Sequence, residues 1–423
     1  MKRRILPAAG LLPCGLLACG LFAAGQVAAQ ALFVNDATVH TMGPQAVLQD
    51  ADILVRDGRV QAIGAGLPIP ADAVLIEAAG RPVTPGFFAG ITQLGLTEIA
   101  AEELPLPLAP ATEVLRPEYN VTPSYNPLAT AIPVTRIEGY TWSVLEASRP
   151  ASIIGGQGRA VLLDDAFGSF IGDSILFVDL GADAVVLGTT SRAGQWMLLE
   201  QAMSEAASEL PWLPEPVLTL PGRRALAHYQ SGAITVFHAD RAGDILQVLE
   251  FSARHQLKPV ISGGAEAWMV ADRLAEAGVP VLVDALSNLP GNFDQLGARL
   301  DNAALLHAAG VTITFAGAGT HHARALRQVA GNAVANGLPY EAGLAAMTVN
   351  PATIFELGPE HGTLAIDSRA DLVIWSGDPL EVTSVAEQVV IGGQPLPMVS
   401  RQTLLRDRYL PEDTRLPRAY IKP

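Results

Sequence analysis

His238, Glu266, Asp284 and His321 are titratable residues that each follow a short apolar run in the second half of the chain. An imidazole and carboxylates that meet at one point can transfer protons as general acids and bases. The same groups can also bind a metal ion. We therefore take these four residues as candidate catalytic residues, which requires them to converge on one face of the fold.

Each candidate also has a structural interpretation. Glu266, like Asp240 and Asp244, stands where a helix is expected to begin, and carboxylates stabilise helix N-termini. His238 could be only a hydrogen-bonded side chain beside a helix start, and adjacent residues such as His321 and His322 rarely both point inward. Four further histidines are interpreted as structural: His40, His255, His307 and His361.

Other catalytic classes find little support. The segment Gly155-Gly156-Gln157-Gly158 lacks the lysine and the hydroxyl of a phosphate-binding loop, so it predicts a tight turn. No Gly-x-Ser-x-Gly nucleophile motif is present. The two cysteines, Cys14 and Cys19, lie in an apolar N-terminal segment that is expected to be removed, which would leave no thiol for catalysis or metal binding.

The elements that must position the candidates alternate regularly. Apolar runs at 233–237, 259–262, 279–283 and 311–316 predict strands. Helices are predicted at 244–255, up to 277, near 295–309 and near 324–336. This alternation indicates parallel βαβ units, which suit either a barrel or an open doubly wound sheet.

Both ends of the chain look different from this middle. Residues 31–84 and those after 351 contain short strands, and Asp57-Gly58 favours a tight hairpin turn. An α/β barrel inserted into a small β domain is therefore expected. The proline-rich segment 101–133 has two interpretations, a packed structural loop or a lid over the barrel mouth.

Four stretches resemble the amidohydrolase superfamily in order and spacing. They are the hairpin at 51–60, the segment Ala79-Gly80-Arg81-Pro82-Val83-Thr84-Pro85-Gly86-Phe87, the segment Met347-Thr348-Val349-Asn350-Pro351-Ala352, and Gly362-Thr363-Leu364 followed by 370–375. The resemblance implies a (β/α)₈ TIM barrel over 85–355 and a β-sandwich formed by 30–84 and 356–423. It also implies a hydrolase of C–N bonds in amides, non-standard peptides or acyl-amino acids, usually with zinc or another divalent metal.

The resemblance places metal ligands at the carboxyl ends of barrel strands, where barrel active sites lie. Most of these ligands are missing here. The two histidine positions after strand one hold Ile91 and Gln93, so Thr92 and Gln93 are expected to contact a ligand rather than a metal. A bridging lysine is also absent, because Lys258 precedes its strand and Lys422 is next to last.

The remaining family positions repeat this loss. Strand six ends in Ser262-Gly263 instead of histidine, and Gly319 or Ala318 takes the place of the strand-eight aspartate. Only His238 matches a family ligand, and one imidazole does not hold a catalytic zinc. We therefore expect no bound metal and no other cofactor.

The N-terminus predicts export to the periplasm. Lys2, Arg3 and Arg4 precede an apolar run, and small residues at 27–29 predict cleavage before Gln30, so 1–29 is interpreted as a signal peptide. A lipoprotein anchored at Cys19 is the alternative. The formal charge of −15 argues against nucleic acid as a partner, and no second long apolar run predicts a transmembrane segment.

Three functions fit these observations. The first is a metal-poor barrel that binds a small amide-like or peptide-like ligand with little or no metal-dependent turnover. The second is an active hydrolase with a rebuilt site around His238, Asp284 and His321, with Glu266 as a further candidate. The third is a non-catalytic subunit that pairs with an active relative; a homo-oligomer is equally compatible with the sequence.

Overall fold

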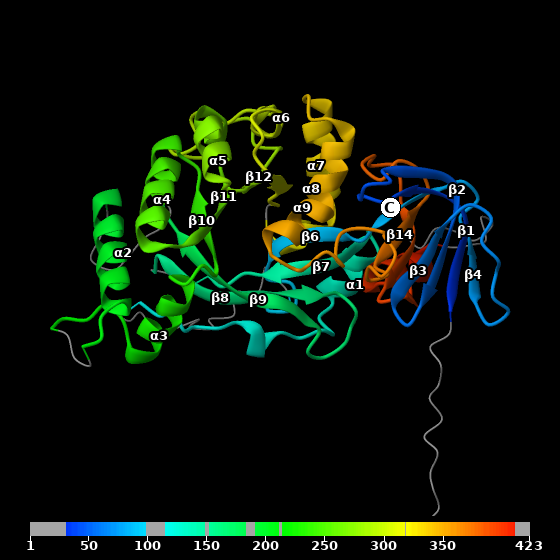
Figure 1. Cartoon of the computed structure of the whole chain (residues 1–423), viewed down its shortest axis with the longest axis horizontal. Coiled ribbons are helices and arrows are strands. Elements are labelled where there is room, and N and C mark those ends of the chain that lie inside the picture. Colours follow the sequence, from blue (N-terminus) through cyan, green and yellow to red (C-terminus); the bar gives the residue numbers. More distant parts are fainter. Residues whose placement is uncertain are drawn as a thin grey trace, which may run out of the picture.

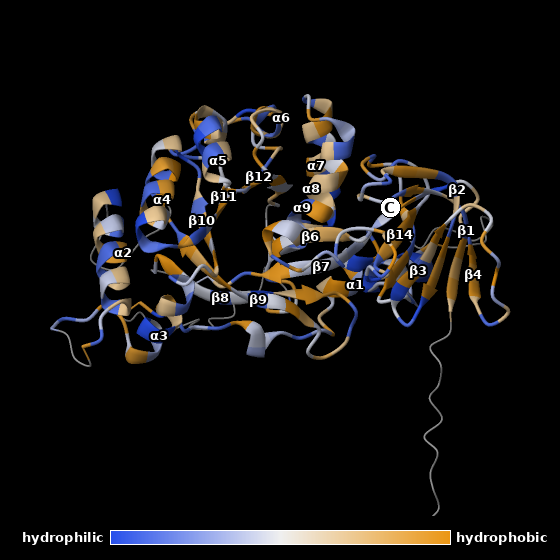
Figure 2. Cartoon of the chain, viewed as in Figure 1, coloured by the Kyte–Doolittle hydropathy of each residue, from blue (hydrophilic) through white to orange (hydrophobic). Residues whose placement is uncertain are grey.

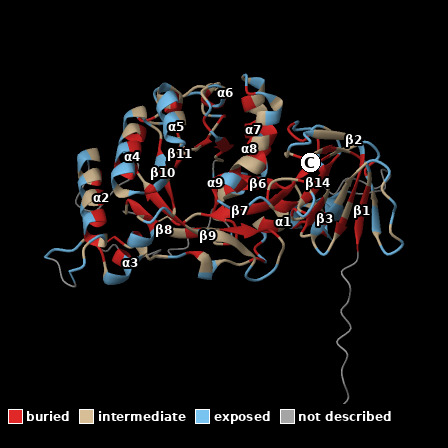
Figure 3. Ribbon diagram, viewed as in Figure 1, coloured by how far each residue is buried: buried red, intermediate tan, exposed pale blue. Residues whose placement is uncertain are grey.

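A computed structural model of the chain describes residues 31–98, 115–148, 152–182, 191–210, 214–317 and 319–410. The predicted signal peptide, residues 101–114 of the proline-rich segment, Ala318 and Lys422 lie outside these residues. Two sheets organise the described chain, and Figure 1 shows them side by side. Their strands are largely apolar and buried, whereas the outer faces of α2, α4 and α5 are more polar and exposed (Figures 2 and 3).

The first sheet is formed by both ends of the chain, and its order is β16-β15-β14-β5-β1-β2-β3, with β4 paired to β1. At the predicted hairpin, Asp57 and Gly58 both have positive φ (53° and 77°), as a tight β-hairpin turn requires. The strands are β1 (Leu32–His40), β2 (Val47–Arg56), β3 (Arg59–Gly64), β4 (Val74–Glu77), β5 (Pro82–Pro85), β14 (Leu372–Trp375), β15 (Ala386–Ile391) and β16 (Gln394–Leu396).

The second sheet is a nearly closed barrel in the order β13-β12-β11-β10-β9-β8-β7-β6. Its two ends meet where the Gln93 N–H donates a 2.9 Å hydrogen bond to Oγ1 of Thr320. The predicted TIM-barrel architecture with a separate β domain is thus confirmed. The strands are β6 (Phe87–Thr92), β7 (Tyr140–Leu145), β8 (Ile154–Leu162), β9 (Phe170–Asp179), β10 (Ile234–Ala239), β11 (Lys258–Gly263), β12 (Val281–Val283) and β13 (Ile313–Phe315).

One strand departs from a regular (β/α)₈ pattern. β8 runs antiparallel to both β7 and β9. Its connections to these neighbours are short and contain no described helix, and a parallel crossover needs a dozen residues or more. The chain therefore reverses direction twice here and resumes the parallel pattern at β9.

The predicted tight turn at Gly155-Gly156-Gln157-Gly158 is wrong, because these residues lie within β8. Their glycines are explained by close backbone approach rather than by a turn. A Cβ on Gly155 would lie 2.2 Å from the Ala147 carbonyl oxygen, and one on Gly158 would lie 1.7 Å from the Leu145 carbonyl oxygen. Only glycine allows the bent hairpin to pack this closely.

Helices cover the outside of the barrel between its later strands. The predicted helix near 295–309 is shorter than expected, because α6 begins only at Asn302, and the residues before it form a long loop. The helices are α1 (Ala131–Arg136), α2 (Arg192–Ala206), α3 (Leu220–Tyr229), α4 (Ala242–His255), α5 (Ala271–Ala277), α6 (Asn302–Ala308), α7 (Leu326–Ala335), α8 (Tyr340–Met347), α9 (Val349–Ile354) and α10 (Arg401–Tyr409), with 3₁₀ turns η1 (Thr122–Ser124), η2 (Ala267–Val270) and η3 (Thr320–Ala325).

The described part of the proline-rich segment packs against the barrel wall. Val121 is buried, and its N–H donates to the Gln157 carbonyl oxygen of β8. Leu115 forms a bridge with Leu218. Residues 115–130 therefore form a packed loop that leads into α1.

In the described part of the chain, no helix is both long and apolar enough to cross a membrane.

Candidate binding and acid–base site

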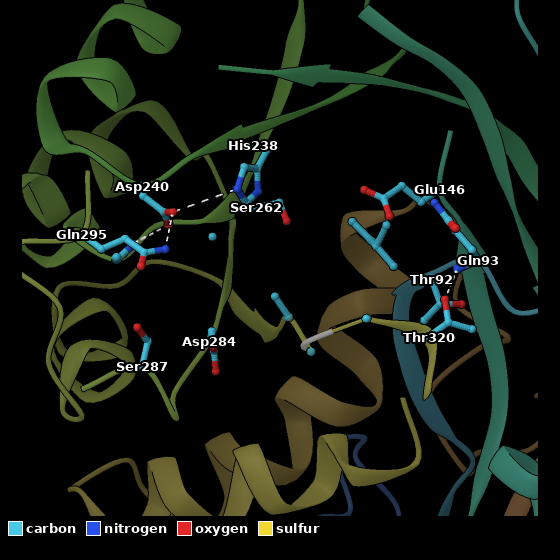
Figure 4. A pocket seen from close by; sticks show the side chains of 16 residues that line it. Thr92, Gln93, Glu146, His238, Asp240, Ser262, Asp284, Ser287, Gln295 and Thr320 are labelled. Atoms are coloured by element: carbon cyan, nitrogen blue, oxygen red, sulfur yellow. Dashed lines mark hydrogen bonds and ion pairs between the residues drawn. The ribbon is translucent and has the colours of Figure 1, made fainter. Parts of the chain in front are cut away.

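A cavity of about 450 Å³ lies at the carboxyl ends of the barrel strands. In Figure 4, Asp240, Gln295, Ser287 and Asp284 lie along one side and Glu146, Gln93 and Thr320 along the other. Among the described residues, no lysine or arginine lines this cavity. The lining residues are Ile91, Thr92, Gln93, Glu146, His238, Asp240, Ser262, Gly263, Ala265, Asp284, Ser287, Gln295, Ala316, Gly317, Gly319 and Thr320.

His238 extends into the cavity from the end of β10. Its side chain is 52% exposed, and Nε2 lies 4.0 Å from Oδ2 of Asp240, whose side chain is only 10% exposed. Asp240 is held in place by two donors: its Oδ1 accepts from the Ala265 N–H at 3.2 Å, and its Oδ2 accepts from Nε2 of Gln295 at 2.8 Å. The imidazole is therefore free to meet a ligand, while its acidic neighbour is fixed by the protein.

Asp240 is a site residue that the sequence interpretation missed. It was assigned to the start of the following helix, but that helix has Arg241 at its N-cap, with no side-chain cap bond. Asp244 does lie in the first turn of α4, where it also forms a 2.9 Å ion pair with Arg192. Of the two aspartates, only Asp244 has the predicted helix-start role.

Glu146 is a second residue that was not anticipated. It follows β7, and its N–H donates to the Thr92 carbonyl oxygen at the end of β6. Burial, followed by the negative charge of Asp179, raises the pKa of the Glu146 carboxyl to about 7, although His238 acts in the opposite direction. Near neutral pH this carboxyl is therefore able both to give and to accept a proton.

Asp179 lies next to His238 across two paired strands. It ends β9 and is the register partner of His238 on β10. Burial raises the pKa of its carboxyl, and His238 again opposes this shift. The His238 imidazole thus interacts electrostatically with three carboxyl groups, those of Glu146, Asp179 and Asp240. With three acidic groups and one imidazole, the site as a whole is acidic.

The structure brings together some of the predicted site residues. Asp284, which follows β12, lines the same cavity as His238, and its Oδ1 accepts the Leu286 N–H at 3.0 Å. Thr92 and Gln93 line the opposite side, at the end of β6. Four lining residues, His238, Asp284, Thr92 and Gln93, were therefore predicted from sequence because barrel active sites lie at the carboxyl ends of the strands.

Glu266 and His321 do not join them. The Glu266 carboxylate is buried and accepts from the N–H groups of Ala242 and Gly297, both at 3.0 Å, so it ties α4 to the loop before α6. His321 lines a separate cavity beside Arg324 and Arg401. The expected convergence of four side chains therefore does not occur for these two.

The residues present do not fit the divalent metal that the family resemblance implies. Isoleucine and glutamine at 91 and 93 and serine at 262 supply no imidazole, thiolate or carboxylate, which are the ligands zinc prefers. Among the described residues, no group of three or more His, Cys, Asp or Glu side chains is placed to hold a metal ion. We therefore assign no step of any reaction to a metal.

Comparison with known proteins links the chain to one family. Residues 294–397 match the model of the amidohydrolase family. Over 57 residues the chain is 46% identical to imidazolonepropionase of Mycolicibacterium smegmatis, and over 57 residues it is 42% identical to amidohydrolase tasK of Hapsidospora irregularis. Each match covers 14% of this chain, and they span only 14% of the imidazolonepropionase and 6% of tasK.

Solved structures extend the likeness to most of the chain. An amidohydrolase from Thermotoga maritima is 24% identical, with a TM-score of 0.74 over 86% of this chain and 99% of its own. An adenosine deaminase from Xanthomonas campestris with bound zinc is 16% identical, with a TM-score of 0.54 over 89% and 96%. These likenesses show that the chain has the fold of these proteins, and the match over 294–397 shows that this part of the chain is similar to the amidohydrolase family.

Proposed function

We propose that the cavity binds a small amide-like or peptide-like molecule and that any turnover does not depend on a tightly held metal ion. One observation carries this proposal: the barrel keeps a polar cavity at its mouth, but isoleucine, glutamine and serine stand at positions where the family has metal ligands. Export to the periplasm, inferred from the N-terminal segment, is part of the same proposal.

The charge of the cavity lining restricts the chemical class of ligand that the cavity can bind. Glu146, Asp240 and Asp284 contribute carboxyl groups, whereas the described lining residues include one imidazole, that of His238, and no lysine or arginine. A free carboxylate would be repelled, whereas amide N–H groups can donate to these oxygens. We therefore favour ligands whose buried end is an amide, such as an N-acyl amino-acid amide, over the corresponding free acid.

The metal content of the purified protein directly tests the proposal that the site holds no metal ion tightly. Protein produced in medium supplemented with zinc and manganese should carry well under one ion per chain after dialysis, because the preferred ligands are missing. Elemental analysis measures this content. One or two ions per chain that survive dialysis would contradict the proposal and favour a metal site that the sequence does not reveal.

A rebuilt acid–base site is the second candidate function. Its support is that Glu146, with a pKa of about 7, lies in the same cavity as His238. A group with a pKa near the working pH is well suited to proton transfer. His321 takes no part in this version, since it lies outside the cavity.

His238→Ala separates the two candidates. If the cavity only binds, the substitution should weaken affinity for N-acetylglycinamide about fivefold, which corresponds to the roughly 1 kcal/mol of one hydrogen bond. If His238 transfers a proton, turnover should fall about 10²–10⁴-fold. Calorimetric titration and an amide-hydrolysis assay measure the two effects, and His307→Ala, on the exposed surface of α6, is the matched control. We expect the smaller effect; robust turnover that disappears in the variant would overturn the binding-only proposal.

A further inference from the structure

The loop formed by residues 284–301 connects β12 to α6 (Figure 1). It carries both cavity-lining polar residues and exposed apolar residues. Asp284, Ser287 and Gln295 line the polar cavity. Large apolar side chains stand between and beside them in the sequence and remain exposed to solvent: Leu286 (53% exposed), Leu289 (78%), Phe293 (85%) and Leu296 (64%).

The second half of this loop is fastened to the rest of the barrel at residues 294–297, so Phe293 and Leu296 are exposed beside a held segment. Asp294 accepts from the Ala182 N–H at 2.7 Å and forms an ion pair with Arg192. Gln295 donates to Asp240, and the Gly297 N–H donates to Glu266. These bonds hold Asp294 and Gln295 on the barrel, while the large apolar side chains of the loop remain exposed to solvent.

We propose that this loop binds the apolar chain of an amphiphilic ligand whose amide end lies in the cavity. The inference rests on the proposed function and adds a substrate class, amides that carry a linear acyl chain. Leu286 adjoins Ser287 in the sequence and Leu296 adjoins Gln295, so exposed apolar side chains stand beside residues that line the cavity. Large apolar side chains that a protein leaves exposed together commonly mark a binding site.

The charge of the molecule favours this occupant over a membrane. The chain carries a formal charge of −15, and the neighbouring cavity is acidic. An anionic lipid surface would repel such a protein. A single acyl chain attached to a neutral amide meets no such repulsion.

The test uses N-acetyl-, N-hexanoyl- and N-decanoylglycinamide, titrated calorimetrically into the full-length mature protein below their aggregation concentrations. Affinity should rise about two- to fourfold for each added methylene that the loop covers. In the double variant Leu289→Ser with Phe293→Ser this gain should be lost while binding of the acetyl compound is unchanged. Both side chains are exposed, so the fold should tolerate the change.

A matched control replaces exposed apolar residues elsewhere, Phe167→Ser with Leu404→Ser. It should retain the full dependence on chain length. Equal affinity for all three amides would overturn this inference and leave the proposed function standing, whereas no binding by any of them would overturn both. Vesicle binding or self-association that disappears in the loop variant, with no chain-length dependence, would assign the loop to a membrane or to a second copy instead.

Discussion

Glu146→Gln should raise the free energy of unfolding at pH 8 by about 3 kcal/mol and flatten its dependence on pH between about 5 and 8. Burial and Asp179 raise the Glu146 pKa from 4.5 to about 7 in the folded chain. The folded state therefore keeps its proton where the unfolded state has lost it, so stability falls as pH rises from about 4.5 to about 7. A difference of roughly 2.5 pKa units corresponds to about 3 kcal/mol.

Urea denaturation at several pH values measures this effect. Glutamine has the shape of a protonated glutamate, so the variant removes the cost of ionisation while preserving packing. Glu250→Gln, on the exposed surface of α4, is the control and should leave the pH profile unchanged. An unaltered slope in Glu146→Gln would show that this carboxyl does not carry a raised pKa.

The outcome also bears on the site. When Glu146 loses its proton near neutral pH, the cavity gains a negative charge, and the hydrogen bonds that it can form with a ligand change. Below this pH the Glu146 carboxyl can donate to a ligand carbonyl, and above it the carboxylate can only accept. Ligand affinity measured beside the stability profile would reveal which form the ligand needs.

The sequence predicted best those elements whose patterns are local. The βα units from β10 to α7 follow from apolar runs alternating with helical spacing, and the first hairpin follows from Asp57-Gly58. β8 could not be recognised, because the glycines at 155, 156 and 158 are needed for contacts with distant backbone. The late start of α6 has a similar origin: Asp294 and Gln295 make tertiary bonds that a helix at that place would break.

The site was predicted in part for the same reason. His238 and Asp284 were found because each follows a recognisable parallel strand. Glu146 follows β7 and Asp179 ends β9, two strands that the sequence pattern did not identify, so no strand-end argument pointed to them. Proximity to a strand end also leaves side-chain direction open, which is why Glu266 and His321 were placed in the cavity by sequence but lie outside it in the structure.

Arg327→Met should destabilise the protein by about 3–5 kcal/mol, because this side chain joins the two sheets of the fold. Arg327 is the second residue of α7, on the barrel, and its side chain is only 5% exposed. Its guanidinium donates to the carbonyl oxygens of Glu381 at 2.7 Å and Ser384 at 2.6 Å, in the segment that precedes β15. It also lies over the ring of Trp375, 5.6 Å from the ring centre.

Methionine would fill much of the volume but would leave these buried acceptors without donors, and each unpaired group costs about 1–3 kcal/mol. Glu138, 3.7 Å away, would lose its positive partner as well. Urea denaturation followed by tryptophan fluorescence measures the loss, with Arg254→Met as the control because that side chain is 54% exposed. A loss below about 1 kcal/mol would mean that the β domain is held on the barrel by apolar packing around Trp375 rather than by this arginine. A large loss of stability with two separate unfolding transitions in the variant would show that Arg327 couples the unfolding of the two sheets. In that case the bonds from Arg327 to the segment before β15 are needed for both sheets to unfold together.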